Sequence, residues 1–116
     1  THKTGLLNLK QTYSADFDKG MVTQNGADIW FQAVNASTLL LTPRNGAKLA
    51  LGNLQNRGYA GCKNASYSSS RVRLSDVPIN SYVCVKTSQG RISQFRLNSI
   101  NGGATTTLKL GYTTWK

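Results

Sequence analysis

Residues 81–98 read SYVCVKTSQGRISQFRLN, and this stretch decides the fold class. Two runs with alternating apolar and polar side chains, Ser81 to Thr87 and Arg91 to Asn98, flank a short polar segment. Gln89 and Gly90 fit a two-residue hairpin loop, because glycine accepts a positive φ without a Cβ clash. The stretch therefore predicts an antiparallel β-hairpin.

A two-residue loop also sets the register of this hairpin. It places Tyr82 opposite Leu97 and Cys84 opposite Phe95, and we expect the face that carries these four side chains to be buried. The other face then carries Val83, Val85, Gln94 and Arg96.

The same alternation recurs along the chain in short runs that Gly, Asn, Asp and Ser separate. Besides the hairpin, these runs are Leu6 to Phe17, Asp28 to Val34, Thr38 to Thr42, Lys48 to Leu51, Arg71 to Leu74 and Thr105 to Trp115. Only Gly46 to Asn56 favours a brief helix, because it is rich in Ala, Leu and Lys. About eight short strands predict one all-β domain over residues 1–116, an antiparallel β-sandwich of immunoglobulin-like or jelly-roll-like type, with a small closed barrel as the alternative.

Asp76 to Lys86, DVPINSYVCVK, resembles the strand of immunoglobulin-like domains in which a tyrosine stands two residues before a cysteine. The resemblance covers this segment alone. Cys62 and Cys84 are too close in sequence for the usual bridge between sheets, and no tryptophan lies between them. The resemblance implies a sandwich and assigns no family.

The chain has two cysteines, Cys62 and Cys84, and they form no C-x-x-C metal or redox motif. We predict a disulfide between them, worth about 3.4 kcal/mol in the chain-entropy treatment. The alternative is two buried free thiols in a cytosolic protein. A disulfide predicts a secreted or extracellular protein, and no apolar run approaches the roughly 20 residues of a membrane-spanning helix.

Charge is the most unusual property of the composition. Fourteen Lys and Arg residues face four acidic ones, which gives a formal net charge of +10. Such an excess predicts an anionic partner, although it also serves solubility by self-repulsion. Lysines on edge strands disfavour sheet-to-sheet pairing, so we expect a monomer.

Side chains that carry catalysis are scarce. The one histidine, His2, stands near the chain end, where fraying is expected, and no catalytic triad or cofactor motif is present. Asp16, Asp18 and Asp28 are interpreted first as solvated carboxylates at a strand end, beside the Lys19-Gly20 turn. Two alternatives are a carboxylate pair for hydrolysis and a Ca²⁺ site. We expect no enzyme activity, no cofactor and no metal, with these three aspartates as weak Ca²⁺ candidates.

One stretch, residues 57–73, combines basic and aromatic side chains around a cysteine. The arginine guanidinium can donate two parallel hydrogen bonds to a carboxylate, sulfate or phosphate group, and a tyrosine ring can stack on a sugar or base. The predicted ligand-binding residues are Arg57, Tyr59, Lys63, Tyr67, Arg71 and Arg73. The alternative is that Tyr59 and Tyr67 pack against the core while the charges are only solvated.

Two tryptophans are further candidates for stacking on a ligand. Ile29 and Phe31 alternate with Trp30, so either Trp30 or Phe31 points outward or toward a second layer. Burial is favoured for Trp30, because large aromatic side chains dominate protein cores. Trp115 is either a plug at a strand end or an exposed platform.

Together these observations predict a non-catalytic extracellular binding module for an anionic carbohydrate or cell-surface polymer. The first alternative is a secreted binding or inhibitory domain that docks on an acidic protein. The second is a nucleic-acid binder, whose affinity would fall steeply with salt.

Overall fold

The computed structural model describes residues 2–35, 37–102 and 105–116. Within them, two five-stranded antiparallel sheets have the strand orders β1-β10-β9-β8-β6 and β3-β2-β4-β5-β7. The elements are β1 Lys3–Lys10, β2 Ser14–Asp16, β3 Met21–Val22, β4 Ile29–Asn35, β5 Thr38–Pro43, β6 Lys48–Leu51, α1 Gly58–Lys63, β7 Val72–Arg73, the 3₁₀ helix η1 Leu74–Asp76, β8 Tyr82–Lys86, β9 Ile92–Asn101 and β10 Thr107–Thr114.

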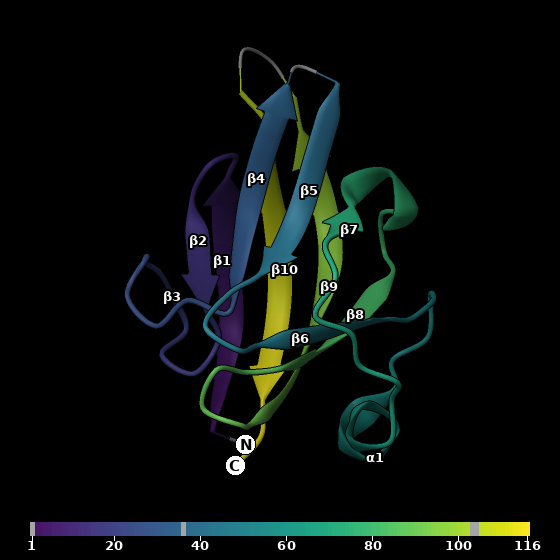
Figure 1. Cartoon of the computed structure of the whole chain (residues 1–116). Helices are drawn as coiled ribbons and strands as arrows, with labels where there is room; N and C mark the ends of the chain where they lie inside the picture. The colour runs from purple at the N-terminus through teal and green to yellow at the C-terminus, as the bar shows by residue number, and fades with distance from the viewer. Residues whose placement is uncertain (1, 36, 103–104) are drawn as a thin grey trace.

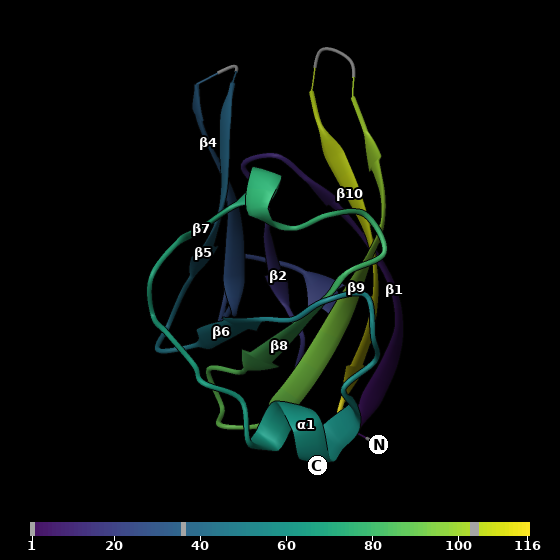
Figure 2. The same cartoon turned by 90° about the vertical axis from the view of Figure 1, so that its right-hand side faces the viewer.

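The two sheets pack face to face, which confirms the predicted all-β sandwich (Figures 1 and 2). Apolar side chains from alternate strand positions fill the space between them, as the period of two in the sequence requires. Phe17 lies at the centre, with ring centroids 5.6 Å from Phe95 and 5.7 Å from Tyr112. Both sheets therefore contribute aromatic rings to one core.

The β8–β9 hairpin forms as predicted, but its register is shifted by one residue. The Thr87 amide donates to the Arg91 carbonyl and the Gly90 amide to the Thr87 carbonyl, so the loop has three residues, Ser88 to Gly90, with Gly90 at φ 84°. A shift of one residue exchanges the two faces of one strand relative to its partner, and here β8 is the strand whose faces are exchanged. The core face consequently carries Val83, Val85, Phe95 and Leu97, while Tyr82, Cys84, Gln94 and Arg96 lie on the outer face.

Two further expectations are wrong. The run Leu6 to Phe17 is not one strand, because a turn in which Thr12 has φ 76° carries the chain from β1 in one sheet to β2 in the other. Residues 46–56 do not form a helix, because β6 pairs with β8 there. Sheet pairing overrides the helix propensity of Ala, Leu and Lys in this segment.

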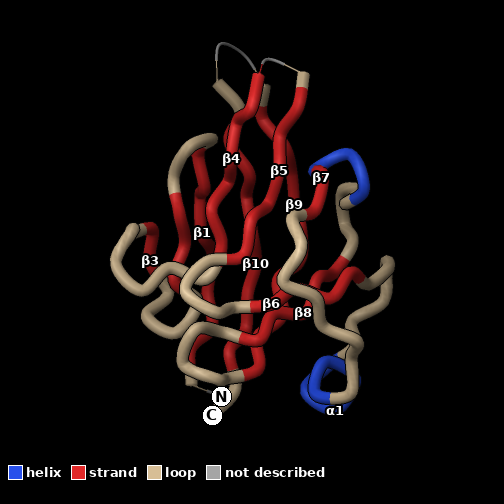
Figure 3. Tube along the Cα trace, in the orientation of Figure 1, coloured by secondary structure: helices blue, strands red, loops and turns tan. Residues whose placement is uncertain are grey.

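The single α-helix of the described residues, α1, lies at the lower end of the molecule and contacts β9 (Figure 3). The predicted Cys62–Cys84 disulfide is present and ties α1 to β8. Both cysteines are fully buried and pack with Ala50, although they lie outside the main core. The bridge therefore secures a helix to one sheet and does not join the two sheets.

Both ends of the chain lie beside α1 at one end of the sandwich (Figures 1 and 2). The His2 amide donates to the Thr114 carbonyl and extends the β1–β10 pairing. Within the described residues, no helix is long and apolar enough to cross a membrane.

Candidate functional site

The predicted ligand-binding stretch, residues 57–73, does not form one surface. Its first part gathers at α1, where the Tyr59 and Trp115 ring centroids are 5.7 Å apart and nearly edge to face. The Lys63 ammonium lies 5.8 Å from the Tyr59 centroid. Tyr59 is 40% exposed, so it is not a core residue. The fold thus joins Tyr59, Lys63 and Trp115 in one basic and aromatic cluster.

Arg57 and Tyr67 are turned toward the disulfide. The Arg57 guanidinium lies 3.4 Å from the Cys84 Sγ atom, and the Tyr67 hydroxyl donates to the Cys62 carbonyl at 2.6 Å. Burial raises the pKa of Tyr67 to about 12, against a smaller lowering by the charge of Arg57. Tyr67 therefore packs as a lid over the bridge, which was the alternative interpretation for this residue.

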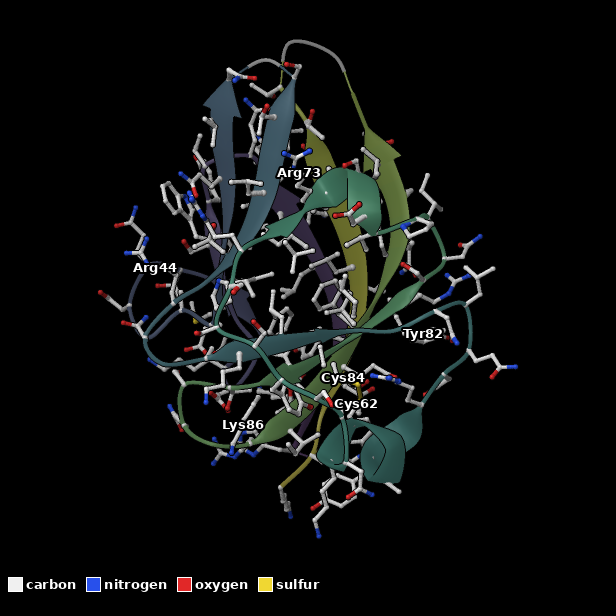
Figure 4. All side chains as sticks on the ribbon, turned by 45° about the vertical axis from the view of Figure 1, so that its right-hand side comes forward. Arg44, Cys62, Arg73, Tyr82, Cys84 and Lys86 are labelled. Atoms are coloured by element: carbon white, nitrogen blue, oxygen red, sulfur yellow. A yellow bond between two sulfur atoms is a disulfide. The ribbon has the colours of Figure 1, made fainter. Side chains whose placement is uncertain are left out.

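Arg73 lies in the edge strand β7, away from the disulfide (Figure 4), and Arg71 directly precedes this strand. They line a pocket of about 370 Å³ together with Val34, Thr38 and Leu40. Arg73 also lines a neighbouring pocket of about 350 Å³. Neither lining includes an aromatic side chain, so these arginines have no stacking partner in their pockets.

Trp30 occupies the outer face of its sheet, contrary to the expectation of burial. Ile29 and Phe31 take the two inward positions of β4 and are fully buried, which leaves Trp30 half-buried between them on the other face. Its indole Nε1 donates to the Thr12 carbonyl at 2.9 Å. The Arg44 guanidinium carbon lies 5.2 Å from the centroid of its ring. The Trp30 ring is therefore held at its edge and covered by a cation.

A polar pocket of about 390 Å³ surrounds this pair and is bounded mainly by hydroxyl and amide side chains. An adjoining pocket of about 440 Å³ shares three of its residues, Thr12, Ser14 and Gln24, and adds the exposed ring of Tyr13. We call the two together the Trp30 groove. It is lined by Thr12, Tyr13, Ser14, Val22, Thr23, Gln24, Asn25, Ala27, Trp30, Arg44 and Asn45.

Sequence reasoning proposed Trp30 but missed Arg44 and the groove amides. The signal for Arg44 lies in strand pairing: Trp30 stands opposite Thr42, and Arg44 follows two residues later on the same face. Gln24 and Asn25 belong to the segment between β3 and β4, which carries no pattern that points to a site.

The three aspartates predicted near a strand end come together, but in the interior. Asp16 and Asp28 are fully buried and Asp18 is 3% exposed, so the interpretation as solvated carboxylates is wrong. One carboxylate oxygen from each lies within 4.8 Å of those of the other two. They meet because β2, the turn after it and the residue before β4 converge on the β8–β9 loop.

Backbone amides and one arginine hold this aspartate cluster. Asp28 accepts from the amides of Phe17 and Ser88, each at 2.7 Å, and Asp16 accepts from the amides of Asp18 and Lys19. Burial raises the pKa of Asp28 to about 6, and the charge of Asp18 adds to this, while the two amide hydrogen bonds oppose it. The cluster is thus crowded with negative charge.

Burial of these aspartates leaves the surface strongly basic. All eight lysines and four of the six arginines are exposed, whereas Asp76 is the one exposed acid of the described residues. The exposed charged side chains of the described residues are therefore almost all positive.

Comparisons of the chain with models of protein families, with curated proteins and with solved structures find no match. Geometry and charge therefore carry the functional argument.

Proposed function

We propose that the domain is a non-catalytic module of an extracellular protein and binds an anionic carbohydrate, as part of a polysaccharide or cell surface, in the Trp30 groove. The observation that carries this proposal is the Arg44 guanidinium, 5.2 Å from the Trp30 ring centroid in a pocket lined by amides and hydroxyls. A site for an anionic sugar needs a bidentate hydrogen-bond donor for the acidic group, an apolar surface for the ring, and hydrogen-bonding side chains for the hydroxyl groups.

Arg44 is suited to bind a carboxylate or sulfate without leaving Trp30. Stacking uses the flat face of a guanidinium, whereas a bidentate pair with an oxyanion uses its N–H edge. Arg96, by comparison, already donates to Asn80 and Asn98. Among the described residues no hydrogen bond engages the Arg44 guanidinium, so its donors are available to a ligand.

The rest of the groove provides the contacts that a neutral part of a sugar requires. Gln24 and Asn25 offer both donors and acceptors for hydroxyl groups. Tyr13 and Trp30 supply aromatic surface in the two adjoining pockets, which gives room for more than one sugar unit. Specificity would come from these neutral contacts and affinity in part from the charge pair.

Charge and the disulfide give further support. A surface with one exposed acid attracts polyanions over a distance and speeds their encounter. Its exposed basic residues lie on both sheets, in β1, β6, β7, β8 and β10, and also on α1 and at Arg44, and this dispersal favours local recognition over tracking of a nucleic-acid backbone. The Cys62–Cys84 bridge favours an oxidising, extracellular location.

The non-catalytic part of the proposal follows from where the acid–base groups lie. The His2 Nε2 donates to the Asp18 carbonyl at 3.0 Å, and the three clustered aspartates are buried. None of these groups lines the Trp30 groove. The groove therefore offers a ligand binding contacts without a general acid or base.

The experiment is a binding panel of neutral, uronate and sulfated glycans with single- and double-stranded nucleic acids, each at low and at near-physiological salt. We expect selective binding to one class of acidic glycan that persists at the higher salt. Binding to every polyanion that disappears with salt would refute groove recognition, and capture of an acidic protein without any glycan binding would favour the docking alternative.

A further inference from the structure

The aspartate cluster of Asp16, Asp18 and Asp28 holds more negative charge than its surroundings neutralise. Among the described residues its one ion-pair partner is Arg91, whose Nη1 lies 3.2 Å from the Asp18 Oδ1 atom. Three carboxylates and one guanidinium leave an excess of negative charge in the interior. Burying an uncompensated charge is strongly unfavourable, so either a bound cation or protonation must offset it.

The hydrogen bonds of the cluster show where a cation would lie. Thr87 and Arg91 both donate to Asp18 Oδ1, and both oxygens of Asp28 accept backbone amides. Two oxygens, Asp16 Oδ2 and Asp18 Oδ2, are buried and have no hydrogen-bond partner. Buried polar atoms are almost always satisfied in native proteins, so this pair marks a position for a ligand.

The cluster also has the dimensions of a cation site. Its three nearest carboxylate oxygens lie within 4.8 Å of one another. Ca²⁺ binds oxygen at 2.3–2.6 Å, so oxygens on opposite sides of one ion are about 5 Å apart. The cluster is therefore compact enough for one ion to contact all three carboxylates.

We propose that Asp16, Asp18 and Asp28 form a structural Ca²⁺ site at the end of the sandwich where the β8–β9 loop meets β2 and β4. Ca²⁺ is favoured over Mg²⁺ because Mg²⁺ retains several waters in an octahedral shell, and side chains with 3% exposure or less leave little access for them. Backbone carbonyls, such as that of Gly26 beside Ser88, would complete the oxygen shell. These groups all belong to the segment from β2 to the start of β4, so the ion would fasten this segment where the β8–β9 loop is hydrogen-bonded to it.

This inference is independent of the Trp30 groove, and its test uses no glycan. The chain is stripped of metal with EDTA and titrated with CaCl₂ in a calorimeter, with MgCl₂ and NaCl at matched ionic strength as comparisons. We expect one Ca²⁺ per chain and weaker binding of Mg²⁺. At a Ca²⁺ concentration about 100-fold above Kd, the Tm should rise by about 10 °C.

Asp16→Asn removes one ligand charge with little change of shape, and Asp76→Asn is its matched control at the exposed aspartate. We expect Asp16→Asn to lose the Ca²⁺ response and Asp76→Asn to keep it. Equal Ca²⁺ binding by both variants would overturn the assignment to this cluster. If Asp16→Asn fails to fold, the wild-type titration alone tests the proposal. The absence of binding heat, together with the same Tm in EDTA and in Ca²⁺, would overturn the Ca²⁺ site and indicate that protons neutralise the cluster.

Discussion

The Arg44 guanidinium carbon lies 5.2 Å from the centroid of the Trp30 ring. The pairing of β4 with β5 creates this contact, because it sets Trp30 opposite Thr42 and brings the residue two positions further along to the same face. A cation held over an aromatic face contributes about 0.5–1 kcal/mol at an exposed site. The arrangement therefore orients Arg44 before any ligand arrives.

Binding in the Trp30 groove should be visible in tryptophan fluorescence. Trp30 lines the groove, whereas Trp115 packs against Tyr59 beside α1. We expect Trp115→Phe to retain the change in emission that an acidic oligosaccharide causes, and Trp30→Phe to lose it. The opposite result would place the ligand on the cluster of Tyr59, Lys63 and Trp115.

Removal of the disulfide should lower stability without changing the fold class. Cys62 and Cys84 are 22 residues apart and tie α1 to β8, outside the main core. The double variant Cys62→Ser with Cys84→Ser should lose about 3.4 kcal/mol of unfolding free energy in denaturant titrations. Reduction of the wild-type bridge should produce a similar loss, and no loss in either case would contradict the role assigned to the bridge.

Tyr67 should be a late-titrating tyrosine. Burial raises its pKa from 10.0 to about 12 in the folded chain. A raised pKa in the folded state means that the neutral phenol favours folding; this contribution is complete below pH 10 and is lost as the pH rises toward 12. Tyrosinate absorbance should show a late transition that Tyr67→Phe removes. An unchanged titration curve in this variant would show that Tyr67 is not the late group.

Two glycines with positive φ should respond differently to alanine. A Cβ on Gly20, at φ 69°, would strike the Tyr112 hydroxyl, whereas a Cβ on Gly46, at φ 84°, has nothing within 4 Å. Both variants bear a backbone cost of roughly 1–2 kcal/mol. Gly20→Ala should lose about 1–3 kcal/mol more, because Tyr112 must move from its contact with Phe17. Equal unfolding free energies for the two variants would show that Tyr112 moves freely.

Strand periodicity and the cysteines predicted most of the fold. Leu108, Leu110 and Tyr112 alternate in sequence and are buried in β10, and the runs at β4, β5 and β6 lie where the alternation places them. These features depend on local patterns, which a sequence displays directly. The Cys62–Cys84 pairing followed because the chain contains no other cysteine.

The sequence-based predictions fail where the conformation of a single backbone residue determines strand register or strand boundaries. A loop of three residues in place of two inverted the two faces of β8 relative to β9, and a positive φ at Thr12 separated β1 from β2. Helix α1 has six residues, too few for a helical stripe. The groove and the aspartate cluster depend on contacts between distant segments, such as Ser88 with Asp28, which spacing along the chain does not reveal.

The most direct test of the central claim compares Arg44→Gln with Lys109→Gln for affinity to the acidic glycan that the panel selects, at near-physiological salt. Lys109 is exposed in β10, which belongs to the other sheet. Each variant removes one exposed positive charge, so the two variants share a net charge. Loss of a bidentate charged pair is worth about 1.5–3 kcal/mol, so Arg44→Gln should bind at least about 10-fold more weakly than wild type. Lys109→Gln should stay within about 2-fold, because Lys109 is exposed on the other sheet and a distant surface charge is screened. Equal losses in the two variants would contradict recognition in the Trp30 groove and attribute binding to net charge alone.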